Sequence, residues 1–207
     1  MNYESLIFDI DGTLWDSRSL VARGYNLQLH REGLDRLAIT PDRLTPLFGK
    51  ILPEIADELF TELPREERTA LIYRCAATQD RYLQEDPCQV GYPLVKETLQ
   101  ALSRNHRLFI VSNSQAGYPQ LCMQKLGLEG LITGCLCHGD TGTSKGRTIR
   151  TLMERCGITS AAYIGDTQGD YETTKEAGLP FIWASYGFGH PEHYDAKITK
   201  ISDLMEL

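Results

Sequence analysis

The sequence predicts an α/β fold: a Rossmann-like parallel sheet core with helices on both faces, plus a small α-helical domain inserted after the first strand. Short apolar runs recur along the chain, and each ends in polar residues or glycine. Segments with helical spacing separate these runs, a pattern typical of a parallel sheet that is covered on both faces. Residues 16–87 contain several helical segments and no convincing strand.

Four apolar runs are predicted to be buried strands. The first, residues 6–8, leads into a turn in which Gly12 permits backbone conformations that are closed to other residues. The other three runs each stop at a polar or glycine-rich segment, which marks the end of a strand. They are residues 107–111, 161–164 and 180–184.

Helices are predicted between the strands, over residues 94–102, 149–156 and 171–177, the last of them stopped by Gly178. The inserted region reads as further helices broken near Pro41, Pro53 and Pro64. The predicted domains are therefore a catalytic core of residues 1–15 and 88–207 and a helical domain of residues 16–87.

Composition limits the classes of function. The net charge of the 207 residues is −7, which disfavours nucleic acid as a partner but leaves room for a small anionic substrate in a local positive pocket. No apolar run approaches the ~20 residues that span a bilayer, and no signal-peptide pattern opens the chain. We therefore expect a cytoplasmic protein with no membrane partner. The sequence carries no indication of its oligomeric state.

The six cysteines do not form a disulfide framework, and we expect free thiols. Cys135, Cys137 and His138 form a cluster that raises the alternative of a metal site. Its spacing is tighter than that of usual zinc pairs and no second pair follows, so a strand of small apolar residues is favoured. The cysteines are Cys75, Cys88, Cys122, Cys135, Cys137 and Cys156.

Polar residues follow three of the four predicted strands. In open parallel sheets the carboxyl ends of the strands meet at one edge, where ligands bind. We therefore expect the candidate site residues to converge, although each alone is more often a turn or surface residue. They are Asp9 and Asp11, Ser112 and Asn113, Asp166 and Asp170, with Lys145 opening the helix after residues 131–137.

Carboxylates this close together repel one another, and a dication relieves that repulsion. All-oxygen ligands suit Mg²⁺, with Asp9 and Asp166 as expected direct ligands and the backbone carbonyl of Asp11 as a candidate third. Asp170 lies one helical turn after Asp166 and would either bind the ion or orient its ligands.

The same residues suit phosphoryl transfer. Lys145 and the Ser112 hydroxyl, with nearby backbone N–H groups, would stabilise the charge on the transferring group. Asp9 would be the nucleophile and form an aspartyl-phosphate that water then hydrolyses. Asp11 would protonate the leaving oxygen and later activate the water.

Taken together, these motifs resemble those of the haloacid dehalogenase superfamily, in its branch of phosphoglycolate phosphatases and β-phosphoglucomutases. The segment Asp-Ile-Asp-Gly-Thr at residues 9–13 matches the first motif fully and is the most specific signal. The second motif matches at Ser112 and Asn113, the third at Lys145, and the fourth at residues 165–167 with Asp170.

This resemblance implies particular roles. Asp9, Asp11 and Asp166 would hold magnesium, and Ser112, Asn113 and Lys145 would bind phosphate. The inserted helices would be the small cap domain of the family, which closes over the site and helps to select a small phosphorylated metabolite.

The chain departs from the family pattern at Gly146, where many relatives have proline after the lysine. In the cap region, Lys50 and Arg18 or Arg23 are weaker candidates for contact with an anionic substrate.

Alternative functions remain open at this stage. A phosphotransferase or phosphomutase acting on sugar phosphates would carry every motif named above. A catalytically silent binding protein on the same fold is a remote alternative, because all the acids and the lysine are retained. Asp11 argues against a dehalogenase, and Lys50 leaves open a phosphonatase that forms a Schiff base.

Overall fold

A computed structural model of the protein describes residues 3–87 and 90–207. Contacts between residues divide the chain into two compact units, which are described separately. Unit 1 comprises Met1–Asp16 and Val90–Leu207, and unit 2 comprises Ser17–Gln89.

Unit 1 is built on a six-stranded sheet of order β3-β2-β1-β4-β5-β6, in which every pair of neighbours is parallel. The predicted fold class, a Rossmann-like parallel sheet with helices on both faces, is confirmed. The strands are β1 (Ser5–Phe8), β2 (Arg107–Ser112), β3 (Ile132–Cys137), β4 (Ala161–Gly165), β5 (Phe181–Ala184) and β6 (Ala196–Ile198).

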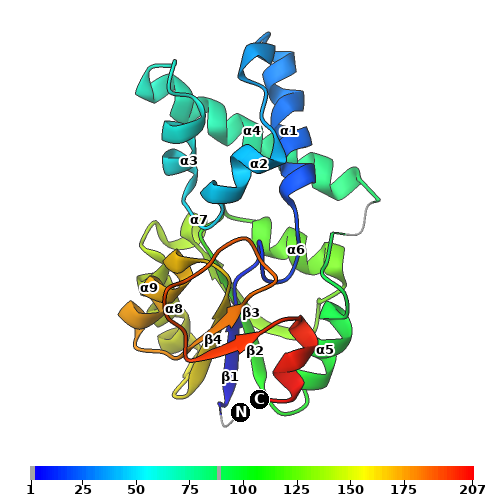
Figure 1. Ribbon diagram of the computed structural model, residues 1–207, viewed down its shortest axis with the longest axis vertical. Helices are drawn as coiled ribbons and strands as arrows, with labels where there is room; N and C mark the ends of the chain where they lie inside the picture. The colour runs from blue at the N-terminus through cyan, green and yellow to red at the C-terminus, as the bar shows by residue number, and fades with distance from the viewer. Residues whose placement is uncertain (1–2, 88–89) are drawn as a thin grey trace. The chain divides into compact units, whose positions relative to one another are not determined.

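Helices lie on both sides of this sheet, with α8 and α9 on one side and α5 and α6 on the other (Figure 1). Side chains of α8 and α9 pack on alternate strand residues such as Ile7, Phe109 and Tyr163 to form a buried core. The helical elements of unit 1 are α5 (Val95–Leu102), α6 (Tyr118–Leu126), α7 (His138–Thr141), α8 (Lys145–Cys156), α9 (Gln168–Ala177) and the 3₁₀ helix η3 (Ile201–Met205).

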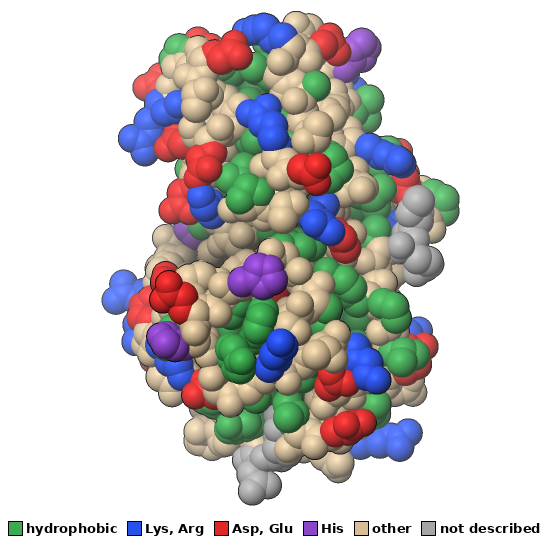
Figure 2. All heavy atoms as spheres, in the orientation of Figure 1, with side chains coloured by type: hydrophobic (Ala, Val, Ile, Leu, Met, Phe, Trp, Pro, Cys, Tyr) green, Lys and Arg blue, Asp and Glu red, His purple; other side chains and the backbone are tan. Residues whose placement is uncertain are grey.

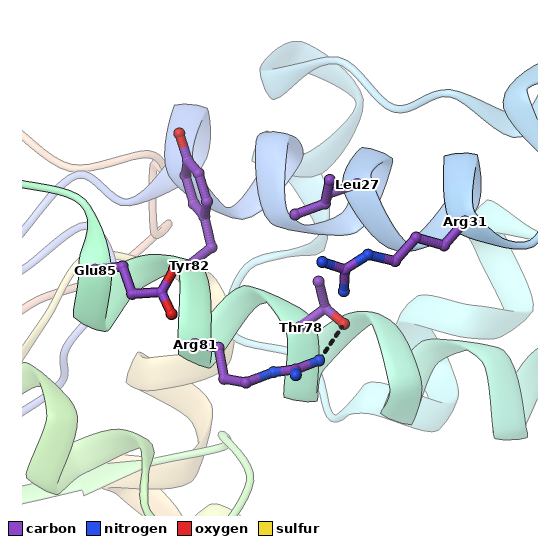
Figure 3. A pocket seen from close by; sticks show the side chains of 6 residues that line it. All are labelled: Leu27, Arg31, Thr78, Arg81, Tyr82 and Glu85. Carbon is purple, nitrogen blue, oxygen red and sulfur yellow. Dashed lines mark hydrogen bonds between the residues drawn. The ribbon is translucent and has the colours of Figure 1, made fainter.

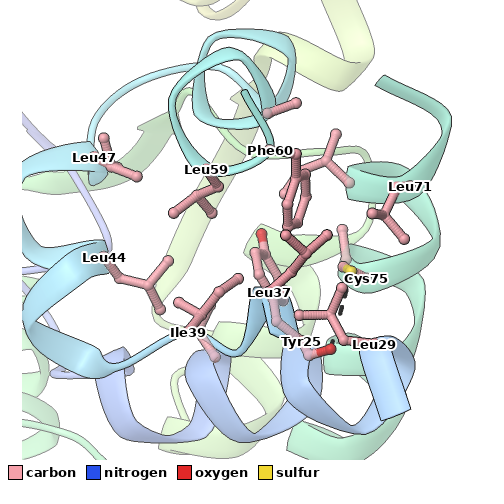
Figure 4. Close-up of a cluster of buried hydrophobic side chains, with 14 of the residues drawn as sticks. Tyr25, Leu29, Leu37, Ile39, Leu44, Leu47, Leu59, Phe60, Leu71 and Cys75 are labelled. Carbon is pink, nitrogen blue, oxygen red and sulfur yellow. Dashed lines mark hydrogen bonds between the residues drawn. The ribbon is translucent and has the colours of Figure 1, made fainter. Parts of the chain in front are cut away.

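Unit 2 consists of helices joined by turns and loops, with no strand among its described residues. Its longest helices, α1 and α4, enclose a separate apolar core (Figure 4) with Tyr25, Leu37 and Phe60 among its buried members. Its elements are α1 (Arg18–Arg31), η1 (Asp35–Leu37), α2 (Pro41–Leu44), η2 (Thr45–Leu47), α3 (Leu52–Leu59) and α4 (Arg65–Glu85).

The three prolines of the inserted region begin helices rather than interrupt them. Pro41 and Pro53 lie in the first turns of α2 and α3, and Pro64 is the N-cap residue of α4. Proline suits these positions because its fixed φ matches the helix and its missing N–H group would have no helical partner there.

The chain leaves unit 1 and returns to it at neighbouring points. The backbone N–H group of Asp16 donates a hydrogen bond of 2.8 Å to the carbonyl oxygen of Val90. Trp15 and Gly91 also form an antiparallel bridge. The two ends of the insertion are thus held together by the backbone of unit 1.

The predicted strand at Cys135 and Cys137 is confirmed as part of β3. The described cysteines are free thiols, as expected, whereas Cys88 lies outside the described residues. The sequence analysis missed the short edge strand β6 and helix α6. None of the helices in the described ranges has the length and apolar character needed to cross a membrane.

Charged side chains of both signs are interspersed over the face shown in Figure 2. In the described residues of unit 2, exposed arginines pair with acids, as Arg74 does with Glu32 through two hydrogen bonds of 2.7 and 2.8 Å. This pair joins Glu32, the C-cap residue of α1, to α4, which is distant in the sequence.

Candidate active site

The sheet brings the predicted residues to one edge. Asp9 directly follows β1, and its N–H group donates to the carbonyl oxygen of Ile164 at 2.8 Å. Asp166 directly follows β4, the strand that pairs with β1. Ser112 is the last residue of β2, on the other side of β1. The carboxyl ends of three adjacent strands therefore supply the polar groups.

Lys145 links two of the carboxylates. It is the first residue of α8, and its Nζ atom lies 2.6 Å from Asp9 Oδ1 and 2.5 Å from Asp170 Oδ1. All three side chains are at least nine-tenths buried. The ring of Tyr163 lies 5.3 Å from the same Nζ atom and adds a favourable interaction with the cation. The ammonium group is thus fixed beside Asp9.

Asp170 braces the loop that carries Asp166. Its second oxygen, Oδ2, accepts hydrogen bonds from the N–H groups of Asp166 and Thr167, at 3.2 and 3.0 Å, and from the Thr167 hydroxyl at 2.7 Å. The Thr167 hydroxyl in turn accepts from the Asp170 N–H group, which completes a capping box at the start of α9. One side chain therefore holds both Lys145 and the end of β4.

Asp166 is fully buried and only partly satisfied. Its Oδ2 atom accepts a 2.6 Å hydrogen bond from the N–H group of Phe188. Its Oδ1 atom is buried and has no hydrogen-bond partner among the described residues. A buried carboxylate oxygen without a partner is energetically unfavourable unless another group, such as a cation, compensates its charge.

Gly12 allows the turn after β1 to approach Asp166. Its φ angle is +87°, which side chains rarely permit, and a Cβ atom at this position would lie 2.3 Å from Asp166 Oδ2. The glycine expected from the sequence to form a turn therefore also makes room for the buried carboxylate.

The electrostatics of the cluster follow from burial and repulsion. Burial raises the pKa of Asp9 to about 7, with the negative charge of Asp170 adding to the shift and Lys145 opposing it. Burial, and then the charges of Asp170 and Asp9, raise the pKa of Asp166 well above its ordinary value. Burial therefore favours the protonated form of both carboxyl groups, and the charge of Lys145 opposes this effect.

The other two members of the cluster remain charged. Burial alone would raise the pKa of Asp170, but the charge and hydrogen bond of Lys145 outweigh it and lower that pKa. Burial alone would lower the pKa of Lys145, but Asp170 and Asp9 outweigh it and raise that pKa well above the usual range. The Lys145–Asp170 pair is therefore a stable ion pair at neutral pH.

The residues present fit a metal ion. Asp9, Asp166 and Asp170 each offer an oxygen, and these atoms all lie within 4.8 Å of one another. Within the described ranges they form the one group of three or more potential ligands of this kind. The Oδ1 atom of Asp166 is buried and has no hydrogen-bond partner among the described residues, and an all-carboxylate set suits a hard cation.

The carboxyl group of Asp11 points elsewhere. Its Oδ1 atom accepts hydrogen bonds from Trp15 Nε1 at 2.8 Å and from the Tyr118 hydroxyl at 2.9 Å. It does not belong to the group of three carboxylates defined above. A contribution of Asp11 to metal binding, through its backbone carbonyl or otherwise, remains a prediction.

Ser112 ends β2, and Asn113 begins the loop that follows it. The Ser112 side chain is buried, and its hydroxyl accepts a hydrogen bond of 3.3 Å from the Ser114 N–H group. This loop lies against Gly139 in α7, where an added Cβ atom would come within 2.0 Å of the Ala116 backbone nitrogen. The phosphate-binding role of both residues remains a prediction.

The departure at Gly146 has a structural reason. A Cβ atom there would lie 3.0 Å from the carbonyl oxygen of Thr173 and 2.6 Å from a carboxylate oxygen of Glu176. Glycine at this position lets the first turn of α8 pack closely against α9, the helix that presents Asp170.

The cap candidates lie in unit 2. Lys50 pairs with Glu58, the Arg18 guanidinium donates to the Thr45 hydroxyl at 3.3 Å, and Arg23 is exposed on α1. Their contact with a substrate remains a prediction.

A shallow hollow between α1 and α4 includes none of the candidate site residues (Figure 3). Arg31, which lines this hollow, is the last residue of α1. A positive charge at that end stabilises the helix through its dipole, so the presence of Arg31 there does not require a ligand.

The sequence analysis missed the residues that support the site. Tyr163 was expected only as part of a buried strand, and Thr167 only as part of the fourth motif. Trp15 and Tyr118 carried no recognisable signal, because their hydrogen bonds to Asp11 depend on how two separate segments fold.

Comparison with known proteins identifies the family. The profile of the haloacid dehalogenase-like hydrolase family matches residues 6–184, which is most of the chain. This chain belongs to that family. The predicted resemblance and the predicted enzyme class, a haloacid dehalogenase-type phosphatase, are thereby confirmed.

The sequence similarity to proteins of known name covers nearly the whole chain. A phosphoglycolate phosphatase from Aquifex aeolicus is 29% identical over 98% of this chain and 95% of its own length. A 5′-nucleotidase from Pseudomonas aeruginosa is 25% identical over 100% of this chain and 97% of its own length.

Solved structures share the fold. A protein from Haemophilus somnus, described as a predicted phosphoglycolate phosphatase, superposes with a TM-score of 0.85 at 21% identity, covering 100% of this chain and 98% of the other. A protein from Clostridium acetobutylicum, described as a predicted phosphatase, gives a TM-score of 0.83 at 20% identity, covering 99% of both chains.

Proposed function

We propose that this haloacid dehalogenase-like phosphatase is magnesium-dependent and hydrolyses small phosphate monoesters through an aspartyl-phosphate on Asp9. The observation that carries the proposal is the buried cluster in which Lys145 joins Asp9 to Asp170 beside the unpartnered Oδ1 of Asp166. In this arrangement a nucleophilic carboxylate, a metal ion and a phosphoryl group would lie next to one another.

Asp9, Asp166 and Asp170 would hold the metal ion. When bound, Mg²⁺ would supply positive charge to offset that of the carboxylates and of the phosphoryl oxygens. It would also favour the carboxylate form of Asp9, whose pKa is raised to about 7 by burial in its absence. Asp170 already holds Lys145 and the Thr167 hydroxyl, so its contribution to the ion would be the weakest of the three.

The protein side chains would then act in two steps. A carboxylate oxygen of Asp9 attacks phosphorus, the bond to the leaving oxygen breaks, and that oxygen keeps the electron pair and takes a proton from Asp11. Water then attacks the phosphorus of the aspartyl-phosphate and gives a proton to Asp11, and the Asp9 carboxylate is released. Lys145, Ser112 and Asn113 would bind the phosphoryl oxygens throughout.

The substrate class proposed is a small soluble phosphate monoester. The relatives named as a phosphoglycolate phosphatase and a 5′-nucleotidase both act on monoesters of that kind by name. We further propose that the inserted helices, residues 16–87, are the cap domain that carries the residues selecting among such esters, and that the enzyme acts in the cytoplasm.

The decisive experiment is a phosphate-release assay with purified protein on a panel of phosphoglycolate, sugar phosphates and nucleoside monophosphates, with Mg²⁺ or with a chelator. We expect Mg²⁺-dependent release from at least one ester, and product analysis showing one free phosphate for each ester consumed. Turnover that persists in chelator would contradict the metal requirement, and conversion to an isomeric ester would indicate a mutase.

We predict that Asp9→Asn abolishes this turnover, because an amide is a poor nucleophile. The matched control is Glu129→Gln, which makes the same change of carboxylate to amide at an exposed position of unit 1 and should leave activity unchanged. Activity retained in Asp9→Asn would remove this residue from the role of nucleophile.

A further inference from the structure

The Asp11 carboxyl group is held by two donors that the proposed function does not use. Trp15 Nε1 and the Tyr118 hydroxyl both donate to the same oxygen, Oδ1, at 2.8 and 2.9 Å. Trp15 is fully buried and Tyr118 is 3% exposed, whereas Asp11 itself is half-buried. Two rigid, buried donors thus fix one oxygen of a side chain that is itself only partly buried.

The two donors come from separate segments. In the turn after β1, the Gly12 N–H group donates to the Trp15 carbonyl oxygen at 2.9 Å, which folds the indole back toward Asp11. Tyr118 is the first residue of α6, which follows the loop that begins at Asn113 after β2. The orientation of Asp11 is therefore coupled to both of these loops.

The aromatic rings also support each other. Their centroids lie 5.6 Å apart with an angle of 65° between the ring planes, an edge-to-face packing that is favourable for aromatic pairs. Because each ring has only two side-chain torsions and is buried, little conformational freedom remains in the hydrogen-bond donors.

We propose that Trp15 and Tyr118 are positioning residues for Asp11, which hold Oδ1 so that Oδ2 exchanges the catalytic proton. This inference rests on the proposed acid/base role of Asp11. An oxygen that already accepts two hydrogen bonds would have to give one up to present a proton to a substrate, so the proton is assigned to the other oxygen.

The same donors assist the proton transfer itself. As the bond to the leaving oxygen breaks, the Oδ2 proton moves to that oxygen and negative charge develops on Asp11. Hydrogen bonds from Trp15 and Tyr118 stabilise this charge because they are already oriented before the transfer. In the second step the carboxylate regains a proton from the attacking water.

A purely structural role predicts a different result. Buried Trp and Tyr side chains need hydrogen-bond partners in any case, and loss of one would then reduce activity on every substrate alike. A positioning role predicts that activity is lost selectively on esters with strongly basic leaving groups, because their hydrolysis depends most on protonation by Asp11. Esters with weakly basic leaving groups need little protonation.

The test compares kcat/KM for 4-nitrophenyl phosphate with kcat/KM for the best alkyl phosphate, in wild type, Asp11→Asn and Tyr118→Phe. Tyr118→Phe removes one hydroxyl and keeps the ring, so the fold should be retained, as a thermal melt will check. We expect a loss of about ten-fold on the alkyl ester, the size of one hydrogen bond to a charged group, and a smaller loss on the nitrophenyl ester.

The matched control is Tyr186→Phe, which removes a partly buried hydroxyl whose 2.8 Å hydrogen bond goes to the Thr13 carbonyl oxygen. It should change kcat/KM for both esters in equal proportion. In the Asp11→Asn background, Tyr118→Phe should add no further loss on the alkyl ester, since Tyr118 acts through Asp11.

The possible failures are distinguishable. If Asp11→Asn itself shows no dependence on the leaving group, the proposed role of Asp11 is wrong. If Asp11→Asn shows that dependence but Tyr118→Phe reduces both esters equally, or adds its full loss in the Asp11→Asn background, only the positioning inference is overturned.

Discussion

At the scale of single residues, the site depends most on Lys145. Its ammonium group lies between Asp9 and Asp170, and the residue as a whole is 3% exposed. Removal of one partner from a buried ion pair leaves a charge with neither solvent nor counter-ion, which is far more destabilising than loss of an exposed pair.

We predict that Lys145→Met lowers the free energy of unfolding by about 3 kcal/mol, the scale for a broken buried pair. The measurement is urea unfolding in chelator at neutral pH. Lys200→Met is the matched control, because that lysine lies 3.8 Å from Asp203 with its side chain 70% exposed, and it should change stability little. Equal effects of the two variants would contradict the assigned importance of the buried pair.

Gly139 is the second residue with a predictable effect. Alanine there would place a Cβ atom 2.0 Å from the Ala116 backbone nitrogen, and backbone cannot yield as a flexible side chain can. We predict that Gly139→Ala displaces the loop carrying Ser112 and raises KM for phosphate esters several-fold. Steady-state kinetics will check this.

The matched control is Gly134→Ala in β3, where the added methyl group would make only an ordinary 3.6 Å contact with Phe109. That variant should keep the wild-type KM. An unchanged KM in Gly139→Ala would show that the loop does not bind the phosphoryl group, or that it tolerates the shift.

At the scale of elements, sequence patterns predicted the central strands and the edge strand β3, but not the other edge strand, β6. The runs before Asp9 and Ser112 are continuous apolar segments because both faces of a central parallel strand are buried. Strand β6 has three residues, one of them the exposed Lys197, so no pattern distinguishes it from a loop.

Some residues of the candidate site could be predicted from the sequence, and others could not. Asp9, Asp166 and Lys145 could be predicted to lie close together, because the carboxyl ends of the strands and the starts of the following helices converge in any sheet of this type. Trp15 and Tyr118 were not, since their hydrogen bonds to Asp11 arise from tertiary packing across 107 sequence positions in the case of Tyr118.

The pairing of α1 with α4 predicts a pH effect on unit 2. The hydrogen bonds from Arg74 lower the pKa of Glu32 below its ordinary 4.5. The stabilisation is therefore present above about pH 4.5 and is lost as the pH falls through the lower, folded-state pKa. Since Glu32 and Arg74 lie near the surface, the contribution is below about 1 kcal/mol.

We predict that Glu32→Gln is less stable than wild type at neutral pH and that the difference shrinks as the pH falls well below 4.5. Thermal melts over that range measure it. The control is Glu62→Gln, which removes one exposed 3.3 Å contact with Arg36 and should have a smaller effect. A difference that is independent of pH would contradict the assignment.

At the scale of the whole molecule, each unit has its own apolar core. A ligand that binds to unit 1 therefore need not stabilise unit 2. We predict that Mg²⁺ slows amide hydrogen exchange in β1, β4 and the start of α9, and leaves exchange in α1 and α4 unchanged. The reason is that Asp9, Asp166 and Asp170 all belong to unit 1.

Asp166→Asn should abolish this protection, and mass spectrometry of peptides from both units supplies the internal control. Equal protection of α1 and α4 would contradict the assignment of the ion to unit 1. No protection anywhere at millimolar Mg²⁺ would contradict the metal site itself.

The hydrogen bond between the Asp16 N–H group and the Val90 carbonyl oxygen has an evolutionary consequence. All six strands of the sheet and the three clustered carboxylates lie outside the segment that begins at Ser17. Because positions 16 and 90 are neighbours, a loop of a few residues could connect them in place of that segment. Gene rearrangement could exchange one insert for another of different specificity while the chemistry is inherited intact.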